Sequence, residues 1–388
     1  MPDFPDDIRN HLALALVPGL GPKLTAALLA ALGSPAAALG ATAAQLRAIP
    51  HIGEQTAAAF AAALRSVDIE PELRLLERFG VRPVPLGFPG YPAPLARVTN
   101  PPPLLYFRGE WTDADATGVG IVGSRACTAY GKRATEQIAR GLARAGVTVV
   151  SGLARGIDGV AHRAALDAGG RTIAALAGGL SAIYPPEHAD LADEVAARGA
   201  LVTETPMTVA PQPGMFPARN RIISGLSRGV VVIEANVRSG ALITARHALE
   251  QGREVFALPG PVDSPASAGC LELIRNGARL IRSADDILDD LKGIAGFSEE
   301  TGGRRQETRK PGSAGGKPEP QLFTDDAPPP ANLDPLQQQV FDLLGSRRHG
   351  DEIARAVGLP VGDLARVLMQ LELKRLVRRQ PGNFYERR

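Results

Sequence analysis

The sequence predicts an α/β protein with a doubly wound parallel sheet, an all-α domain ahead of the sheet and a winged helix after it. Three observations lead to this prediction. Apolar segments of strand length alternate with amphipathic helical segments from Val119 onward, which is the pattern of a parallel sheet. Alanine and leucine recur with helical spacing through residues 8–65. The last segment, from Leu333, has the order of helices and a closing hairpin that is typical of a winged helix.

The composition excludes several classes of protein. The 388 residues are enough for two or three domains, and 44% hydrophobic with 22% charged residues is ordinary for a soluble chain. The net charge of +2 is too small for a globally basic nucleic-acid binder, so any basic site must be local. Cys127 and Cys270 are too few for a disulfide framework or a thiolate zinc site. Without a signal-like start or a long apolar run, we expect a cytoplasmic protein that has no membrane partner.

The first predicted domain spans residues 1–72 and is helical. Two glycine turns, VPGLGPK (residues 17–23) and IPHIGEQ (residues 49–55), each open into a helix and resemble helix-hairpin-helix units of a SAM-like domain. Such turns expose backbone N–H groups to which phosphate can bind. The alternative is a small bundle whose turns only require glycine, and Glu54 in the second turn would repel phosphate.

The second predicted domain spans residues 73–293 and contains the sheet. Its proline-rich start, residues 80–117, includes one strand-like segment, Leu104 to Phe107, which we expect at a sheet edge. The expected parallel strands are residues 119–123, 147–152, 171–177, 200–204, 229–235, 254–260 and 278–281. Parallel sheets of this kind bind ligands at the carboxyl ends of their strands.

The remainder is predicted to be a flexible linker, residues 294–332, and a winged-helix domain, residues 333–388. The linker mixes glycine, proline, serine and charges, so it cannot bury much apolar surface. Acidic residues interrupt the basic residues of the winged helix, which favours a protein contact over duplex DNA for this domain.

Three segments at the expected ligand edge could bind anions. The first strand runs into Gly123, Ser124 and Arg125, just ahead of a helix that should begin near Thr128. Ser239 and Gly240 start a second helix in the same way. Arg219, Asn220 and Arg221 precede the strand at residues 229–235. Several phosphate positions in a row indicate a strand of nucleic acid more than a single nucleotide.

Other chemistries lack their motifs. There is no G-x-G-x-x-G and no Walker A loop, so we expect no dinucleotide or ATP cofactor. No H-E-x-x-H, G-x-S-x-G or paired-carboxylate spacing occurs, so we predict neither a metal nor catalytic residues. Glu204 and Glu234 also stand at strand ends, and ion pairs with them are the alternative explanation for the arginines at 219 and 221.

Several segments together resemble the DNA-processing protein A family (DprA, also called Smf). They are GIVGSRACTAYG, SGLARGIDGVAHRAAL, TIAALAGGLSAIYP, FPARNRIISGLSRGVVVIEA, SGALITARHALEQGREVFALPG and LIRNGA, within residues 80–290. The resemblance implies an extended Rossmann-like fold that binds single-stranded DNA without sequence preference, forms a homodimer and loads RecA in natural transformation and recombination. It also implies a DNA site lined by Gly123, Ser124, Arg125, Arg219, Asn220, Arg221, Ser239 and Gly240. The chain departs from the family's usual residues at Pro186, Glu187, His188 and Leu271.

Two other functions remain open at this point. A nucleotide-processing enzyme of the phosphoribohydrolase and lysine-decarboxylase-like Rossmann group would use Glu234 as its acid, although the Pro-Gly-Gly-x-Gly-Thr loop of that group is absent. An adaptor protein would instead use the winged helix to bind a protein partner.

Overall fold

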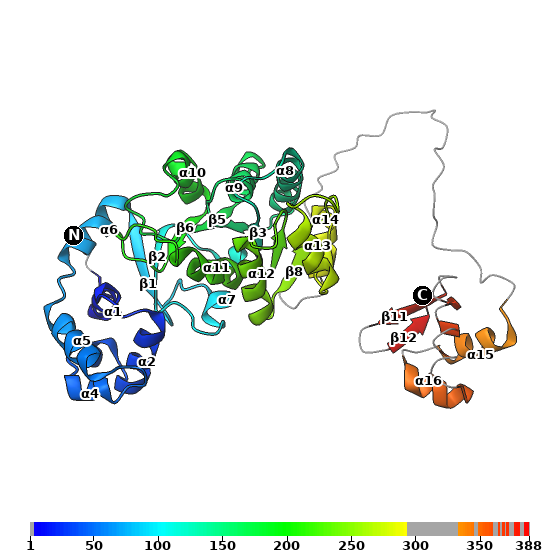
Figure 1. Cartoon of the computed structure of the whole chain (residues 1–388), viewed down its shortest axis with the longest axis horizontal. Helices are drawn as coiled ribbons and strands as arrows, with labels where there is room; N and C mark the ends of the chain where they lie inside the picture. The colour runs from blue at the N-terminus through cyan, green and yellow to red at the C-terminus, as the bar shows by residue number, and fades with distance from the viewer. Residues whose placement is uncertain are drawn as a thin grey trace, which may run out of the picture. The chain divides into compact units, whose positions relative to one another are not determined.

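The computed structural model describes residues 4–292, 333–344, 348–359, 376–380 and 384–387, together with residues 364, 367, 368, 370 and 371. The chain divides into two compact units, Met1–Gln306 and Glu307–Arg388, and each is described by itself (Figure 1). Among the described residues, no helix is both long and apolar enough to cross a membrane. The predicted linker, residues 294–332, lies outside the described residues, and the four predicted domain boundaries stay predictions.

The chain begins with helices that pack around leucines and one phenylalanine, among them Leu28, Leu46 and Phe60. The first predicted glycine turn joins α1 to α2, and the second joins α4 to α5. Gly19 in the first turn has a φ of +79°, a left-handed conformation that favours glycine. The helices are α1 (Asp6–Leu16), α2 (Pro22–Leu32), α3 (Pro35–Leu39), α4 (Ala43–Arg47), α5 (Glu54–Ser66) and α6 (Glu70–Phe79).

A nine-stranded sheet follows, in the order β1-β2-β6-β5-β4-β3-β7-β8-β9. The strands are β1 (Val81–Pro85), β2 (Leu104–Gly109), β3 (Val119–Val122), β4 (Val149–Ser151), β5 (Thr172–Ala175), β6 (Ala200–Thr203), β7 (Gly229–Val232), β8 (Glu254–Ala257) and β9 (Arg279–Leu280). From β6 to β9 all neighbours are parallel, as predicted, whereas β2 is antiparallel to both β1 and β6. The prediction that residues 104–107 form an edge strand is wrong, because β1 pairs with β2 on its outer side and is itself the edge of the sheet. Pro83 and Pro85 obscured β1 in the sequence, and prolines are tolerated there because β1 is the edge strand.

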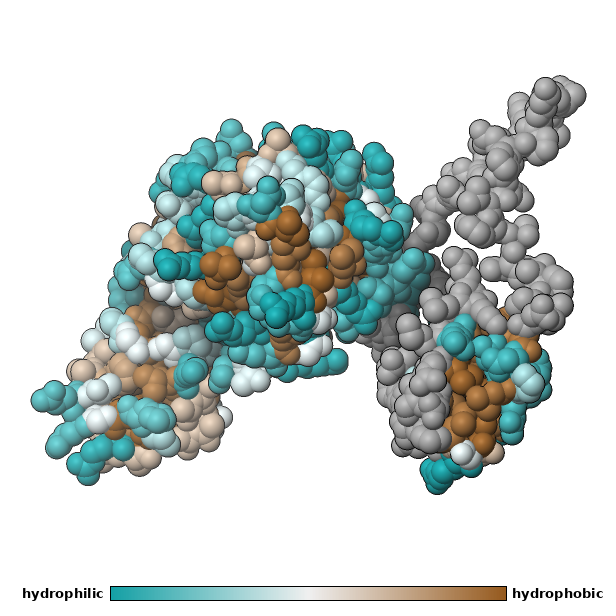
Figure 2. Space-filling view, turned by 45° about the vertical axis from the view of Figure 1, so that its right-hand side comes forward, coloured by the Kyte–Doolittle hydropathy of each residue, from teal (hydrophilic) through white to brown (hydrophobic). Residues whose placement is uncertain are grey.

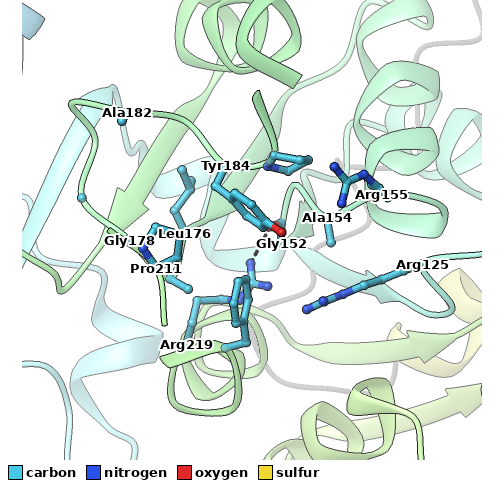
Figure 3. Close-up of a pocket in the computed structure, with 14 residues that line it drawn as sticks. Arg125, Gly152, Ala154, Arg155, Leu176, Gly178, Ala182, Tyr184, Pro211 and Arg219 are labelled. Carbon is cyan, nitrogen blue, oxygen red and sulfur yellow. Dashed lines mark hydrogen bonds between the residues drawn. The ribbon is translucent and has the colours of Figure 1, made fainter. Parts of the chain in front are cut away.

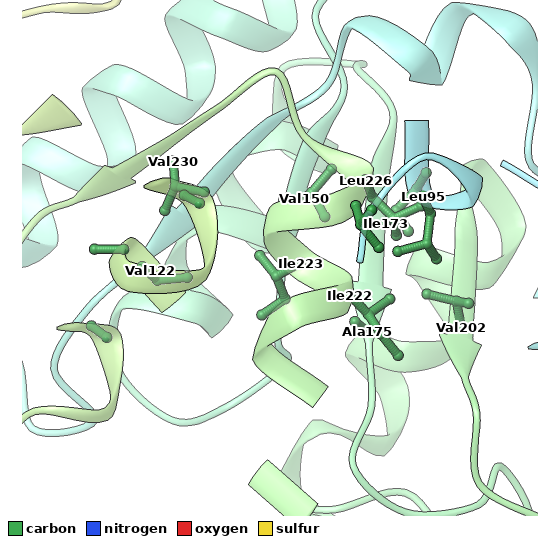
Figure 4. Packing of buried hydrophobic residues seen from close by; sticks show 14 of the residues in the cluster. Leu95, Val122, Val150, Ile173, Ala175, Val202, Ile222, Ile223, Leu226 and Val230 are labelled. Carbon is green, nitrogen blue, oxygen red and sulfur yellow. The ribbon is translucent and has the colours of Figure 1, made fainter. Parts of the chain in front are cut away.

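Helices cover both faces of the sheet. Buried residues of α8, α9 and α14 pack on one face of the sheet, and those of α7, α11, α12 and α13 pack on the other. On this second face, α11 contributes Ile222, Ile223 and Leu226. They pack with strand residues such as Val122 and Val150 (Figure 4). The strands read as continuous apolar runs because both faces are buried. The helices and 3-10 turns are α7 (Ala93–Ala96), η1 (Asp113–Thr117), α8 (Ala129–Arg144), α9 (Ile157–Asp167), η2 (Pro186–His188), α10 (Ala189–Arg198), α11 (Met215–Leu226), α12 (Gly240–Glu250), α13 (Ala268–Arg275) and α14 (Ala284–Leu291).

The strand order reverses between β3 and β7. From β3 the chain builds β4, β5 and β6 on one side, then crosses back to place β7, β8 and β9 on the other side. The loops after β3 and β7 therefore diverge at this point and leave a crevice at the carboxyl ends of the strands. Open α/β sheets bind their ligands at such a switch point.

The second unit has the winged-helix order that the sequence predicts. Its three-stranded sheet has the order β10-β12-β11, and its core includes Val340, Ile353, Leu368 and Tyr385. Leu364, Val367, Leu368 and Leu371 lie in helix and are buried at the place of the predicted third helix. The elements of this unit include α15 (Pro335–Leu343), β10 (Arg348–His349), α16 (Gly350–Val357), β11 (Val377–Gln380) and β12 (Phe384–Arg387).

Candidate nucleic-acid interface

A cleft opens at the switch point between β3 and β7. The loop after β3, the start of α9, the first two turns of α11 and the first turns of α12 form its walls. The structure brings six of the eight predicted site residues to this cleft and leaves Ser124 and Arg221 outside its lining; the six are Gly123, Arg125, Arg219, Asn220, Ser239 and Gly240. Whether these residues contact DNA stays a prediction.

The loop after β3 presents Arg125 to the cleft. Ser124 is half-buried and accepts the Ile157 backbone N–H through its carbonyl oxygen at 3.1 Å. Gly156 has a φ of +72°, and a Cβ there would overlap the backbone of Ser124 and Arg125, so only glycine lets α9 approach this closely. The side chain of Arg125 is exposed, which leaves its charge available.

The start of α8 is not the open anion site that the sequence suggested. Helix α8 begins at Ala129 with Thr128 as its N-cap, as predicted. However, the carboxylate of Glu234 accepts the Thr128 backbone N–H at 2.9 Å and also accepts its hydroxyl. The chain's own anion therefore occupies the positive end of this helix. Glu234 consequently pairs with neither Arg219 nor Arg221.

The start of α12 is open to the cleft. Its N-cap Ser239 accepts the backbone N–H of Ala241 through its hydroxyl at 3.2 Å. Gly240 is exposed, and a Cβ on it would meet nothing within 4 Å, so a ligand has free access to this end of the helix. Asn220 donates from its amide to the Gly240 carbonyl at 3.2 Å and ties α11 to α12. This end of α12 presents the positive end of a helix dipole to the cleft, an arrangement that suits a phosphate.

Arg219 lies beneath the cleft and is only 5% exposed. Its Nη1 donates to the carbonyl oxygens of Gly152, at 2.6 Å, and of Ala175, so the guanidinium joins the ends of β4 and β5. Its Nε is buried without a partner. Burial lowers the pKa of Arg219 to about 10, against the attraction of nearby Asp158, so the group is still charged at neutral pH. Burial also raises the pKa of Asp158, against the opposing effect of the Arg219 charge.

Arg221 points to a different part of the surface. It forms an ion pair with Glu204 at 2.5 Å and donates to the Asn100 carbonyl at 2.5 Å. Both side chains of the pair are mostly buried, at 16% and 15% exposed. At Arg221 the structure therefore has the ion pair with Glu204 that was the alternative to a DNA contact.

Two aromatic residues that the sequence reasoning missed stand at the mouth of the cleft. The guanidinium of Arg125 lies over the Phe216 ring, 4.9 Å from its centroid, and the Phe216 and Tyr184 rings are 6.0 Å apart. Tyr184 is 42% exposed. Figure 3 shows Arg125 extending into the smaller pocket beside the cleft, toward Tyr184 and Arg219. Tyr184 lies in AIYP and Phe216 in FPARNR, and the available signal was the position of Phe216 three residues ahead of Arg219.

The rim of the pocket is only partly basic. Arg155 lines it but is held by an exposed ion pair with Glu187, one of the residues at which the chain departs from the family pattern. Hydrophobic residues are also present on this unit's surface, where Figure 2 shows them in patches between hydrophilic ones. Near the cleft Val237 is 68% exposed. The surface therefore offers rings and apolar side chains between isolated charges.

The described residues hold no cluster of His, Cys, Asp or Glu that could bind a metal ion. His162 is fully buried, and its Nδ1 bonds the Thr172 hydroxyl at 2.7 Å. Burial lowers the pKa of His162 to about 3, so it is neutral at physiological pH. His162 lies on α9 and does not line the cleft. The site offers an exposed charge, the positive end of α12 and two rings, which suit binding of an anionic polymer.

Comparisons with known proteins found two matching family models and several related proteins. A family model described as DNA recombination-mediator protein A matches residues 84–292, and a DprA winged helix domain model matches residues 324–383. Protein Smf of Synechocystis is 41% identical over 315 residues, which cover 77% of this chain and 78% of that protein. The DNA processing protein DprA of Bacillus subtilis is 46% identical over 213 residues, or 55% of this chain and 72% of that one.

Two solved structures are also similar. The DNA processing protein A of Streptococcus pneumoniae superposes with a TM-score of 0.64 at 34% identity, over 74% of this chain and 98% of that one. The DNA processing protein A of Helicobacter pylori gives a TM-score of 0.50 at 31% identity, over 55% of this chain and 96% of that one, and its structure describes a single-stranded DNA binding mode.

Proposed function

Since this chain belongs to the DNA recombination-mediator protein A family, we propose that its cleft binds single-stranded DNA without sequence preference. The single observation that carries the proposal is the meeting of Arg125, the Phe216 and Tyr184 rings and the open end of α12 in one cleft. Proteins that bind single strands combine positive charge along the backbone path with rings on which bases stack. Its role is that of a recombination mediator in DNA processing and natural transformation.

Different residues of the cleft contact different parts of the DNA strand. Arg125 and the exposed positive end of the α12 dipole bind backbone phosphates. Phe216 and Tyr184 take bases by stacking, which every base permits, so no sequence preference results. Arg219 supports the floor of the cleft through its bonds to β4 and β5, and its charge adds to the attraction.

RecA and a second copy of this chain are the partners we propose, on the strength of family membership. The bound strand would then be handed to RecA in the cytoplasm. The winged helix, in the other unit, would contact a protein partner. The four predicted domains, residues 1–72, 73–293, 294–332 and 333–388, are proposed as the units to express separately. Size-exclusion chromatography with light scattering and RecA pull-down on full-length protein test these partners directly.

We also propose that the protein is not an enzyme. The nucleotide-processing alternative requires Glu234 as an acid facing a ligand. In the structure Glu234 is 3% exposed, bonded to Thr128 and absent from the lining of the cleft. A carboxylate used in this way has no free oxygen aimed at a substrate, which disfavours the enzyme reading.

The binding proposal is tested by Arg125→Ala. Affinity of the full chain for a labelled oligothymidylate should fall severalfold, and the slope of log K against log salt should flatten by about 0.7 for each lost phosphate contact. Arg82→Ala on β1 is the matched control, because it removes a charge that is also exposed but lies outside the cleft. Circular dichroism checks folding. Wild-type behaviour of the folded Arg125 variant would remove this residue from the site.

A further inference from the structure

We propose that Glu234 is a positioning residue, which fixes the loop carrying Arg125 by filling the anion position at the start of α8. The proposal rests on the proposed function, because Arg125 is the phosphate contact that the loop presents. Glu234 lies two residues beyond the end of β7 and is 3% exposed, so it is a buried carboxylate whose oxygens need partners.

Those partners form a chain of hydrogen bonds into α8. The Gly131 backbone N–H donates to the Thr128 hydroxyl at 3.1 Å, and that hydroxyl donates its only proton to Glu234. The Thr128 backbone N–H donates to the other carboxylate oxygen at 2.9 Å. Glu234 thereby satisfies two donors at the end of the helix that a free phosphate would otherwise have to satisfy.

The carboxylate is packed as well as bonded. A Cβ at Gly131 would overlap the carboxyl group of Glu234, so glycine there leaves just the room that the carboxylate fills. A Cβ at Gly123 would come within 3.1 Å of the Glu234 carbonyl oxygen. The start of α8 is therefore closed to a DNA phosphate, and the open start of α12 is the helix end that remains for one.

The loop is fixed at its other end by α9. The Ile157 N–H donates to the Ser124 carbonyl at 3.1 Å, and the Ala126 N–H donates to the Ser124 hydroxyl at 3.2 Å. Residues 124–128 thus form a short segment held at both ends, with the exposed Arg125 between them. Releasing the Thr128 end gives Arg125 more freedom, so that ordering its guanidinium on a phosphate costs more conformational entropy.

An electrostatic role and a positioning role for Glu234 predict opposite effects of Glu234→Gln on DNA binding. If the carboxylate acted only as a negative charge near the cleft, Glu234→Gln would strengthen DNA binding. If it positions the loop, Glu234→Gln weakens binding, because the amide NH2 that replaces one carboxylate oxygen cannot accept the Thr128 bond made at that oxygen. Glu72→Gln is the matched control. Glu72 is also buried, at 4% exposed, and its carboxylate accepts the Met207 backbone N–H at 2.9 Å, but it does not line the cleft.

The experiment measures binding of the full chain to a labelled oligothymidylate over a salt series. We expect Glu234→Gln to bind about fivefold or more weakly. Its salt slope should flatten toward that of Arg125→Ala, by at most about 0.7. In the Arg125→Ala background Glu234→Gln should cause no further loss. Glu72→Gln should leave the slope unchanged. A mere loss of folded protein would reduce the amplitude of binding and not the slope.

Hydrogen exchange gives a readout that needs no DNA. The amides of Thr128 and Gly131 should exchange faster in Glu234→Gln than in the wild type, and Glu72→Gln should leave them unchanged. Stronger binding by Glu234→Gln, additive losses with Arg125→Ala, or unaltered exchange at these amides would each overturn the positioning role. If the wild type itself fails to bind the oligonucleotide, the proposed function fails, and the exchange result alone then decides whether Glu234 fixes the loop.

Discussion

Replacement of Phe216 by alanine separates stacking from charge in the cleft. The guanidinium of Arg125 covers this ring at 4.9 Å, and an exposed contact of this kind stabilises the free protein by about 0.5–1 kcal/mol. A base stacked on such a ring contributes about 1–3 kcal/mol. A base that takes this face must displace the guanidinium, so the net loss in Phe216→Ala is the difference, roughly 0.5–2 kcal/mol. That corresponds to about 2- to 30-fold weaker binding.

The assay is again titration of a labelled oligothymidylate at several salt concentrations. The salt slope of Phe216→Ala should equal that of the wild type, because a phenyl ring neutralises no phosphate. Tyr184→Phe keeps its ring beside Phe216 and serves as the control, with binding within about twofold. Unchanged affinity in folded Phe216→Ala would refute the stacking role. A flattened slope would show instead that the ring acts by holding Arg125 in place.

Three further predictions concern other parts of the chain. Truncation after Gly293 should leave the affinity for single strands within about threefold of the full chain, a change in binding free energy below about 1 kcal/mol, because the whole cleft precedes that residue. The same titration measures it, and a tenfold loss would show that the winged helix takes part in binding. Incubation with nucleoside monophosphates should release no base detectable by chromatography, and release that disappears in Glu234→Gln would restore the enzyme reading. His162 has a folded pKa of about 3 against 6.5 when exposed, so the unfolded chain binds the proton first and stability falls as the pH drops below 6.5. Urea unfolding should show His162→Gln losing about 2 kcal/mol less than the wild type between pH 8 and pH 5, and equal losses would contradict the assignment.

The sequence predicted the sheet well because its strands are buried on both faces. Such strands are continuous apolar runs, and each of the seven expected parallel strands contains the observed one. The failure was local: β1 carries Pro83 and Pro85, and prolines argue against a strand unless its place at the edge is known. Edge position is a property of the whole sheet, so no short segment reveals it.

The candidate site was predicted less completely, for a physical reason. The sequence shows which loops lie at the carboxyl edge, and six of the eight residues do line the cleft. It does not show which groups pair with one another. Glu234 stands 106 residues from Thr128 in the chain, and this contact decides that the start of α8 is closed. The contact of Phe216 with Arg125 was equally hidden, because the distance between them depends on how β3 and α11 meet.

The segment Arg219, Asn220 and Arg221 shows how consecutive residues can do separate work. All three lie on α11, where successive side chains are turned by about 100°. One side chain therefore reaches the carbonyls of β4 and β5, the next reaches α12, and the third reaches Glu204 on the far side of the helix. A segment that looks like one basic binding patch in the sequence thus makes three structural links in the fold. The exposed charge of the cleft comes instead from Arg125 on the loop after β3, and this is why we propose that the anchoring of this loop by Glu234 matters for binding.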